Sequence, residues 1–162
     1  FRCAWALAVS REVKKLVWAS EWTGDADASI GLDSPNMEGG LMSSLDDYAR
    51  LLSLHLNDGF WGDNQVLSAE GVGFMRVART EPVGESSGYG MGWWITPARE
   101  GGSIYLYTDP GFYGSISWID IERNYAGAVF FEEYLGVAGR IGSSGVASEL
   151  IPLIEQAIDA VR

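Results

Sequence analysis

The feature that most constrains the fold of this chain is a change in its hydrophobic period. Apolar side chains recur at helical spacing over 45–56, which predicts a helix there. Over 89–95 the period becomes two, because apolar side chains alternate with glycine, and this pattern is typical of a strand. Three further extended runs, at 103–108, 115–121 and 125–133, are joined by short turns. Connections this short predict an antiparallel meander.

Helices are predicted on both sides of these extended runs. Ser44 and Asp47 form a capping box in front of 45–56, and Ser68 opens a shorter helix that reaches Met75. The segment 148–161 carries apolar side chains at helical spacing, and this apolar stripe must cover a sheet. The predicted fold class is therefore α+β, with an antiparallel sheet flanked by helices.

Charge and composition exclude several classes of partner. The 162 residues hold 22 acidic and 11 basic side chains, and the resulting net charge of -11 would repel nucleic acid and anionic membranes. We therefore expect no nucleic-acid and no membrane partner, and the apolar stretch at 4–9 is too short to span a bilayer. With Cys3 as the only cysteine and His55 as the only histidine, the chain cannot build a structural zinc site of the usual four ligands. No metal and no organic cofactor are predicted.

Four sequence blocks share their order with a known family. They are 39–50 (GGLMSSLDDYAR), 67–70 (LSAE), 88–94 (GYGMGWW), and 109–114 (DPGFYG) followed by 118–120 (WID). Over about 38–161 the chain resembles the C-terminal part of the penicillin-recognising serine hydrolases, the group of class C β-lactamases, esterases and D,D-peptidases. The resemblance implies the C-terminal portion of a β-lactamase/transpeptidase-like fold over 38–162. It also implies a small-molecule or peptide substrate and an extracytoplasmic location in bacteria, while 1–37 stay an unassigned lead segment and loop.

The nucleophile of that family is missing from the chain. Acyl transfer in the family needs a serine, a lysine three residues later on the same helix face, and a proton shuttle. The only lysines, Lys14 and Lys15, follow Arg11 and Glu12 at that spacing, so no Ser-x-x-Lys motif exists. We interpret 34–36 (SPN) as a chance match to the family's second motif. The chain is therefore expected to be part of a serine hydrolase, truncated on its N-terminal side and inactive alone.

The resemblance also implies where substrate binds. Asp109, Pro110 and Gly111 occupy the place of the strand-edge triad that faces substrate, and Gly114 closes the same block. The resemblance makes the backbone amide of Phe112 one of two oxyanion donors. A plain Asp-Pro-Gly turn explains the same residues. Because family members commonly carry a cation at position 109, a carboxylate there predicts poor binding of anionic substrates and a preference for neutral or cationic esters or amides.

Other readings of the sequence are open. Residues 84–88 fit the Gly-x-Ser-x-Gly turn around Ser86, but a strand-like run follows where that turn needs a helix, and we interpret the match as chance. His55 is assigned no role. A rival function is a non-catalytic domain of the same fold that binds a peptide or a glycan, since the seven tryptophans suit sugar stacking as well as a core. An incomplete sheet would also expose a strand edge, from which we expect self-association.

Overall fold

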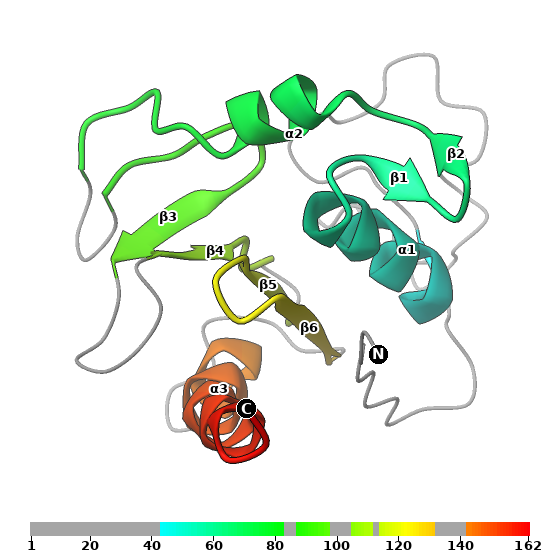
Figure 1. The fold of residues 1–162 in the computed structure, drawn as a ribbon. Helices are drawn as coiled ribbons and strands as arrows, with labels where there is room; N and C mark the ends of the chain where they lie inside the picture. Colours follow the sequence, from blue (N-terminus) through cyan, green and yellow to red (C-terminus); the bar gives the residue numbers. More distant parts are fainter. Residues whose placement is uncertain (1–42, 83–86, 98–104, 112–113, 132–141) are drawn as a thin grey trace, which may run out of the picture.

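The computed structural model describes residues 43–82, 87–97, 105–111, 114–131 and 142–162. Its main sheet has four antiparallel strands in the order β3-β4-β5-β6. Their bounds are Trp94–Pro97 for β3, Tyr105–Thr108 for β4, Ser115–Asp120 for β5 and Tyr125–Phe130 for β6. Each strand pairs with the next along the chain, so the predicted meander is confirmed (Figure 1).

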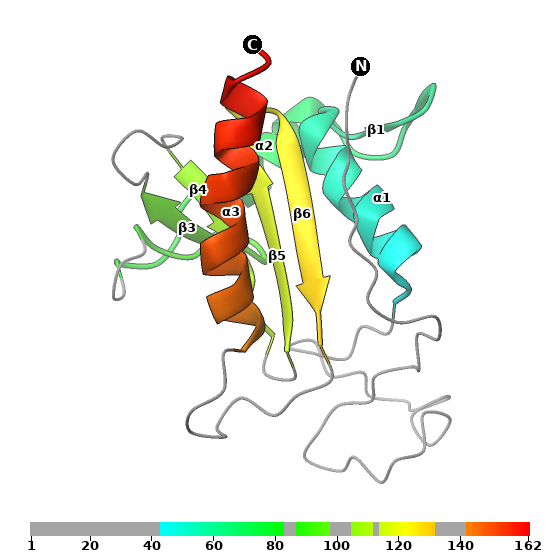
Figure 2. The same cartoon turned by 90° about the horizontal axis from the view of Figure 1, so that it is seen from below.

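Helices cover both faces of this sheet. Helix α1 (Leu45–Leu56) lies on one face, and helix α3 (Ser143–Asp159) lies on the other (Figure 2). Alternation along the strands separates the two cores, because successive side chains of a strand point to opposite faces. Trp118 of β5 packs toward α3, whereas its neighbour Ile119 packs toward α1. The α+β fold class is confirmed.

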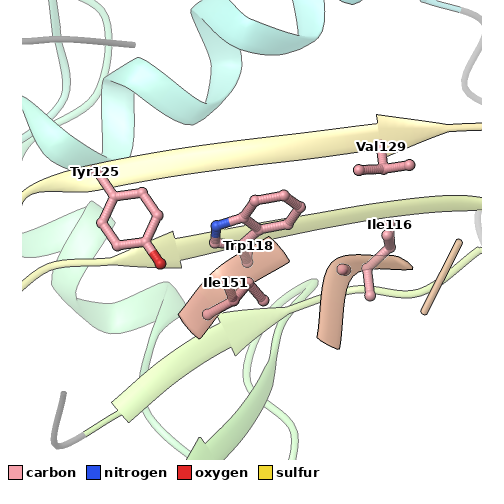
Figure 3. Close-up of a cluster of buried hydrophobic side chains, with 6 residues drawn as sticks. Ile116, Trp118, Tyr125, Val129 and Ile151 are labelled. Carbon is pink, nitrogen blue, oxygen red and sulfur yellow. The ribbon is translucent and has the colours of Figure 1, made fainter. Parts of the chain in front are cut away.

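The core beneath α3 is built from large side chains. Trp118 is 2% exposed and lies with Tyr125 and Val129 against Ile151 of α3 (Figure 3). Gly127 of β6 stands directly opposite Trp118 in the β5–β6 register. A Cβ on Gly127 would meet the six-membered ring of that indole, so only glycine leaves room for the tryptophan.

The segment between α1 and β3 is mostly exposed and holds a hairpin and a short helix. Helix α1 begins after Ser44, whose hydroxyl accepts a hydrogen bond from the Asp47 amide at 3.1 Å, as the capping box predicted. A two-stranded hairpin that the sequence did not indicate follows, formed by β1 (Phe60–Trp61) and β2 (Asn64–Gln65). Helix α2 (Ala69–Met75) comes next, capped by Ser68 as expected.

The strand predicted from Tyr89 is wrong in its first half. Tyr89 forms an isolated antiparallel bridge with Trp94, so the chain turns back on itself between these residues, and β3 starts only at Trp94. Gly88 and Gly92 have φ angles of +127° and +85°, which side-chain-bearing residues rarely adopt. The alternation of glycine with large side chains therefore encodes a turn as well as a strand.

Two other bounds differ from the sequence prediction. Helix α3 begins at Ser143, five residues before the predicted start, and holds Pro152 within it. The last strand ends at Phe130. Within the ranges given above, none of the helices is long and apolar enough to cross a membrane.

Candidate functional site

The candidate site lies where β4 ends and β5 begins. Thr108 pairs with Trp118, and the amide of Asp109 donates a hydrogen bond to the Ser117 carbonyl at 3.3 Å, so Asp109 and Ser117 stand opposite each other. Tyr107 and Ile119, two residues away from them on the same strands, pack in the core beneath α1. Because side chains two apart share a face, Asp109 and Ser117 point to the α1 side of the sheet.

The backbone holds this connection tightly. The amide of Gly111 donates to the Ser115 carbonyl at 2.6 Å, and the amide of Gly114 donates to the Gly111 carbonyl at 3.2 Å. Gly114 is buried with a φ of +90°, a conformation that favours glycine. Pro110 is exposed at the end of β4. Phe112 lies outside the described residues, so its role as an oxyanion donor stays a prediction.

Two tyrosines from other elements complete a polar cluster around Asp109. The Tyr89 hydroxyl, from the segment before β3, donates to Asp109 Oδ1 at 3.4 Å. The Tyr48 hydroxyl, from α1, shares a hydrogen bond with Ser117 Oγ at 3.1 Å. We call these four residues, Tyr48, Tyr89, Asp109 and Ser117, the Asp109 cluster. The sequence predicts a site at Asp109 but does not indicate its three neighbours, because Tyr48 and Tyr89 also fit the apolar patterns of a helix and a strand.

The electrostatics of the cluster follow from partial burial. Burial raises the pKa of the Asp109 carboxyl, and the hydrogen bond from Tyr89 lowers it in part. Burial also raises the pKa of Tyr89, and the nearby charge of Asp109 adds to this rise. The pKa of Tyr48 is raised mainly by burial, with the Ser117 hydrogen bond opposing it. Both phenols therefore keep their protons near neutral pH and remain hydrogen-bond donors.

Within the part of the chain that the structure describes, no Lys or Arg side chain forms an ion pair with Asp109. Each arginine there contacts another group: Arg50 binds Asp47, Arg76 lies over the Tyr107 ring, Arg79 over the Phe74 ring, Arg123 binds Asp159, and Arg162 reaches the Arg123 carbonyl. A half-buried carboxylate without an internal cation is a group that a ligand can neutralise.

The remaining candidates from the sequence do not join this site. Ser86 lies outside the described residues, so the Gly-x-Ser-x-Gly reading is untouched by the structure. Among the residues that the structure places, no three His, Cys, Asp or Glu side chains are grouped so as to hold a metal ion.

His55 is a core residue. Its side chain is 2% exposed, and its ring meets the Trp93 ring edge-on with centroids 5.1 Å apart. Burial, with a smaller effect from the charge of Arg76, lowers the pKa of His55 from 6.5 to about 4. The imidazole is therefore neutral in the folded chain at neutral pH, while the unfolded chain takes up a proton near its ordinary pKa.

The stability of the chain should consequently fall between neutral pH and pH 4. Because the pKa of His55 is depressed in the folded state, its contribution is full above pH 6.5 and is lost as pH falls toward the folded pKa near 4. We expect the change from pH 7 to pH 5 to cost about 2 kcal/mol through this residue. His55→Phe, which keeps a ring beside Trp93, should remove that part of the pH dependence in urea unfolding. A His55 imidazole that titrates near 6.5 by NMR would contradict the prediction.

Comparison with known proteins identifies the class. A family model described as Beta-lactamase matches residues 4–139. The chain therefore belongs to the β-lactamase family of penicillin-recognising serine hydrolases, and the resemblance seen in its sequence blocks is confirmed. The match begins within the lead segment that the sequence blocks left unassigned and ends before α3.

A solved structure gives the same result. The chain is similar to the "putative beta-lactamase from Bacteroides dorei DSM 17855", with 27% identity and a TM-score of 0.54. The similarity covers 74% of this chain and 44% of that one, so the chain spans less than half of its structural neighbour. A search of curated protein sequences found no match.

Proposed function

We propose that this chain is one part of a serine hydrolase that cleaves an ester or an amide through an acyl-serine intermediate. The observation that carries the proposal is a β-lactamase family match over residues 4–139 in a chain that has no Ser-x-x-Lys motif. In this proposal the nucleophile, its lysine and the proton shuttle belong to the part of the hydrolase that this sequence does not contain. The described sheet supplies the wall against which substrate lies.

The chemistry assigned to this wall is binding and charge stabilisation. When the serine oxygen adds to the substrate carbonyl, negative charge develops on the carbonyl oxygen, and backbone N–H groups are the usual donors to it. We assign one such donor to the amide of Phe112, and substrate contact to Asp109, Pro110, Gly111 and Gly114. Neutral or cationic esters and amides fit these assignments better than anionic substrates, because Asp109 lies at the wall.

The chain alone is expected to be catalytically silent. Treated with a fluorophosphonate probe, it should show no covalent labelling above a heat-denatured control, because no serine stands three residues before a lysine. An activated ester such as p-nitrophenyl acetate should likewise turn over no faster than in buffer. Intact-mass spectrometry followed by peptide mapping gives the measurement. Labelling that maps to Ser86 and disappears in Ser86→Ala would overturn the account.

The coding sequence upstream of Phe1 tests the rest of the proposal. A Ser-x-x-Lys motif encoded there supports the hydrolase, and the fluorophosphonate should then label that serine in the longer protein. A start codon close to Phe1 supports a non-catalytic binding domain instead. The described tryptophans give little support to a glycan-binding domain. Trp93 and Trp118 are buried in the two cores, and among the described tryptophans only Trp61 is exposed, at 46%.

Self-association belongs to the same proposal. Among the described strands, β6 has one neighbour, so no described strand pairs with the backbone groups of its outer edge. A second copy of the chain, or the missing part of the hydrolase, would satisfy them in the same way. An extracytoplasmic location is proposed from family membership alone.

A further inference from the structure

The geometry points to the Asp109 cluster as a binding site for a primary ammonium group. The inference rests on the proposed function in one respect only: it takes the ammonium group to belong to a substrate of the proposed hydrolase. The binding itself requires no nucleophile, since every group that it uses lies within the described residues.

The Asp109 carboxylate has more hydrogen-bonding capacity than the folded chain uses. An ionised carboxylate accepts about four hydrogen bonds. Within the described residues, Asp109 is half-buried and accepts one, the 3.4 Å bond from Tyr89, which is long for an O–H donor. Burying a carboxylate without a cation costs free energy. A positively charged ligand that pairs with Asp109 would reduce this cost and so stabilise the folded chain.

The connection between β4 and β5 does not need the Asp109 carboxylate to close. Its closure uses backbone groups: the Asp109 amide bonds to the Ser117 carbonyl at 3.3 Å, and the Gly111 amide bonds to the Ser115 carbonyl at 2.6 Å. No described backbone N–H donates to the Asp109 side chain, in contrast to Asp120, whose carboxylate accepts from the Arg123 amide at 2.8 Å. The side chain of Asp109 is therefore available for recognition.

The groups around Asp109 select the kind of cation. Tyr48 and Tyr89, which are partly exposed, present hydroxyl oxygens that accept N–H donors, whereas Ser117 is 1% exposed and bonds to the Tyr48 hydroxyl from within the core. Both tyrosine rings are held in place, Tyr89 against Trp94 with centroids 4.8 Å apart and Tyr48 against Phe130 at 5.3 Å. A primary ammonium has three N–H donors, enough for Asp109 and two hydroxyl oxygens, and aromatic rings also attract a cation. A trimethylammonium group cannot donate and would leave these oxygens unused.

The test compares four small ligands that share an aromatic ring. The probes are 2-phenylethylammonium, its N,N,N-trimethyl derivative, 2-phenylethanol and 3-phenylpropanoate. They are titrated into the 162-residue chain, with the backbone amides of Asp109 and Ser117 followed by NMR. We expect the primary ammonium to bind at least about tenfold more tightly than the alcohol, as a charge-assisted hydrogen bond implies. The trimethyl derivative should bind several-fold more weakly than the primary ammonium, and the carboxylate weakest of all.

Variants assign the binding to Asp109. Asp109→Asn keeps the shape of the side chain and removes its charge, so ammonium affinity should fall about tenfold or more while 2-phenylethanol affinity stays within about twofold. Asp63→Asn, at an exposed position in the β1–β2 turn, removes the same charge elsewhere and should leave all four affinities unchanged. The far-UV circular dichroism spectra of Asp63→Asn and Asp109→Asn should both match the spectrum of the unmodified chain.

Several results would overturn the inference. These are equal affinity of the unmodified chain for ammonium and alcohol, tighter binding of the trimethyl derivative or the carboxylate, and unchanged ammonium affinity in Asp109→Asn. The ligand series on the unmodified chain decides the question even if the variant does not fold. Because no step measures turnover, ammonium binding without any labelled serine in the longer protein would refute the proposed hydrolase and leave this inference standing.

Discussion

Replacing Arg123 with Met is expected to lower the free energy of unfolding by about 3 kcal/mol, because the change leaves a buried carboxylate without its cation. The Arg123 side chain is 9% exposed, and its guanidinium lies 3.5 Å from Asp120, which is fully buried at the end of β5. The same group forms two parallel hydrogen bonds with Asp159 of α3, at 3.1 and 2.9 Å, and approaches Glu155 at 3.9 Å. Arg123 thus joins the β5–β6 turn to α3.

A backbone hydrogen bond limits the loss of unfolding free energy that we expect in Arg123→Met. The amide of Arg123, which the substitution keeps, still donates to Asp120 Oδ1 at 2.8 Å. We therefore expect the lower end of the range of about 3–5 kcal/mol that follows when a buried pair loses one partner. The hydrogen bond from Arg123 holds the pKa of Asp159 below its ordinary value, so in Arg123→Met this pKa should rise toward 3.8. Guanidinium unfolding and carboxylate NMR titration measure the two effects.

Arg50 provides the matched control. It also pairs with an aspartate three residues away, Asp47, at a distance of 2.8 Å, but the two side chains are 56% and 61% exposed. Because exposed ion pairs contribute little, Arg50→Met should change stability by less than about 1 kcal/mol, even though its pair is the shorter one. Equal effects of the two substitutions, or a neutral Arg123→Met, would mean that burial does not set the strength of the Arg123 contacts.

Local signals explain how much of this fold the sequence predicts. The capping box at Ser44, the spacing of apolar residues and the Asn57-Asp58-Gly59 sequence predict a helix from about Leu45 to Leu56, and α1 has these bounds. Asp58 and Gly59 take positive φ angles at its end, as such residues readily do. The meander follows for the same reason, since each strand pairs with its neighbour in the chain and the turn residues lie between them.

The candidate site is less predictable because its contacts are distant in sequence. Tyr48 and Ser117 are 69 residues apart, and Tyr89 and Asp109 are 20 apart. Periodicity assigns Tyr48 to the apolar face of a helix correctly, but it cannot say that the hydroxyl at the far end of that side chain meets a serine on β5. The bridge from Tyr89 to Trp94 is hidden for another reason, because alternating glycines satisfy the strand pattern while their positive φ angles bend the chain.

Gly127→Ala is expected to destabilise the chain by about 2–3 kcal/mol through overpacking of the core beneath α3. Alanine is ordinarily the better residue in a strand, by about 0.5–1 kcal/mol, so the sign of the effect is diagnostic. Here the added methyl group would meet the Trp118 indole directly across the β5–β6 pair. The ring is 2% exposed and lies in one core cluster with Ala147 and Ile151 of α3, so any shift of the indole has to displace its core neighbours.

A double-mutant cycle assigns the effect to that contact. Trp118→Leu alone should cost about 2–4 kcal/mol, since it removes part of a buried aromatic side chain. In the Trp118→Leu background, Gly127→Ala should cost at least about 1 kcal/mol less than in the unmodified chain, because the leucine leaves room for the methyl group. Gly73→Ala, in α2 with no atom within 4 Å of the added Cβ, is the control and should stabilise the chain by about 0.5–1 kcal/mol. Additive costs at residues 118 and 127 in urea unfolding would show that the indole is not what requires glycine in β6.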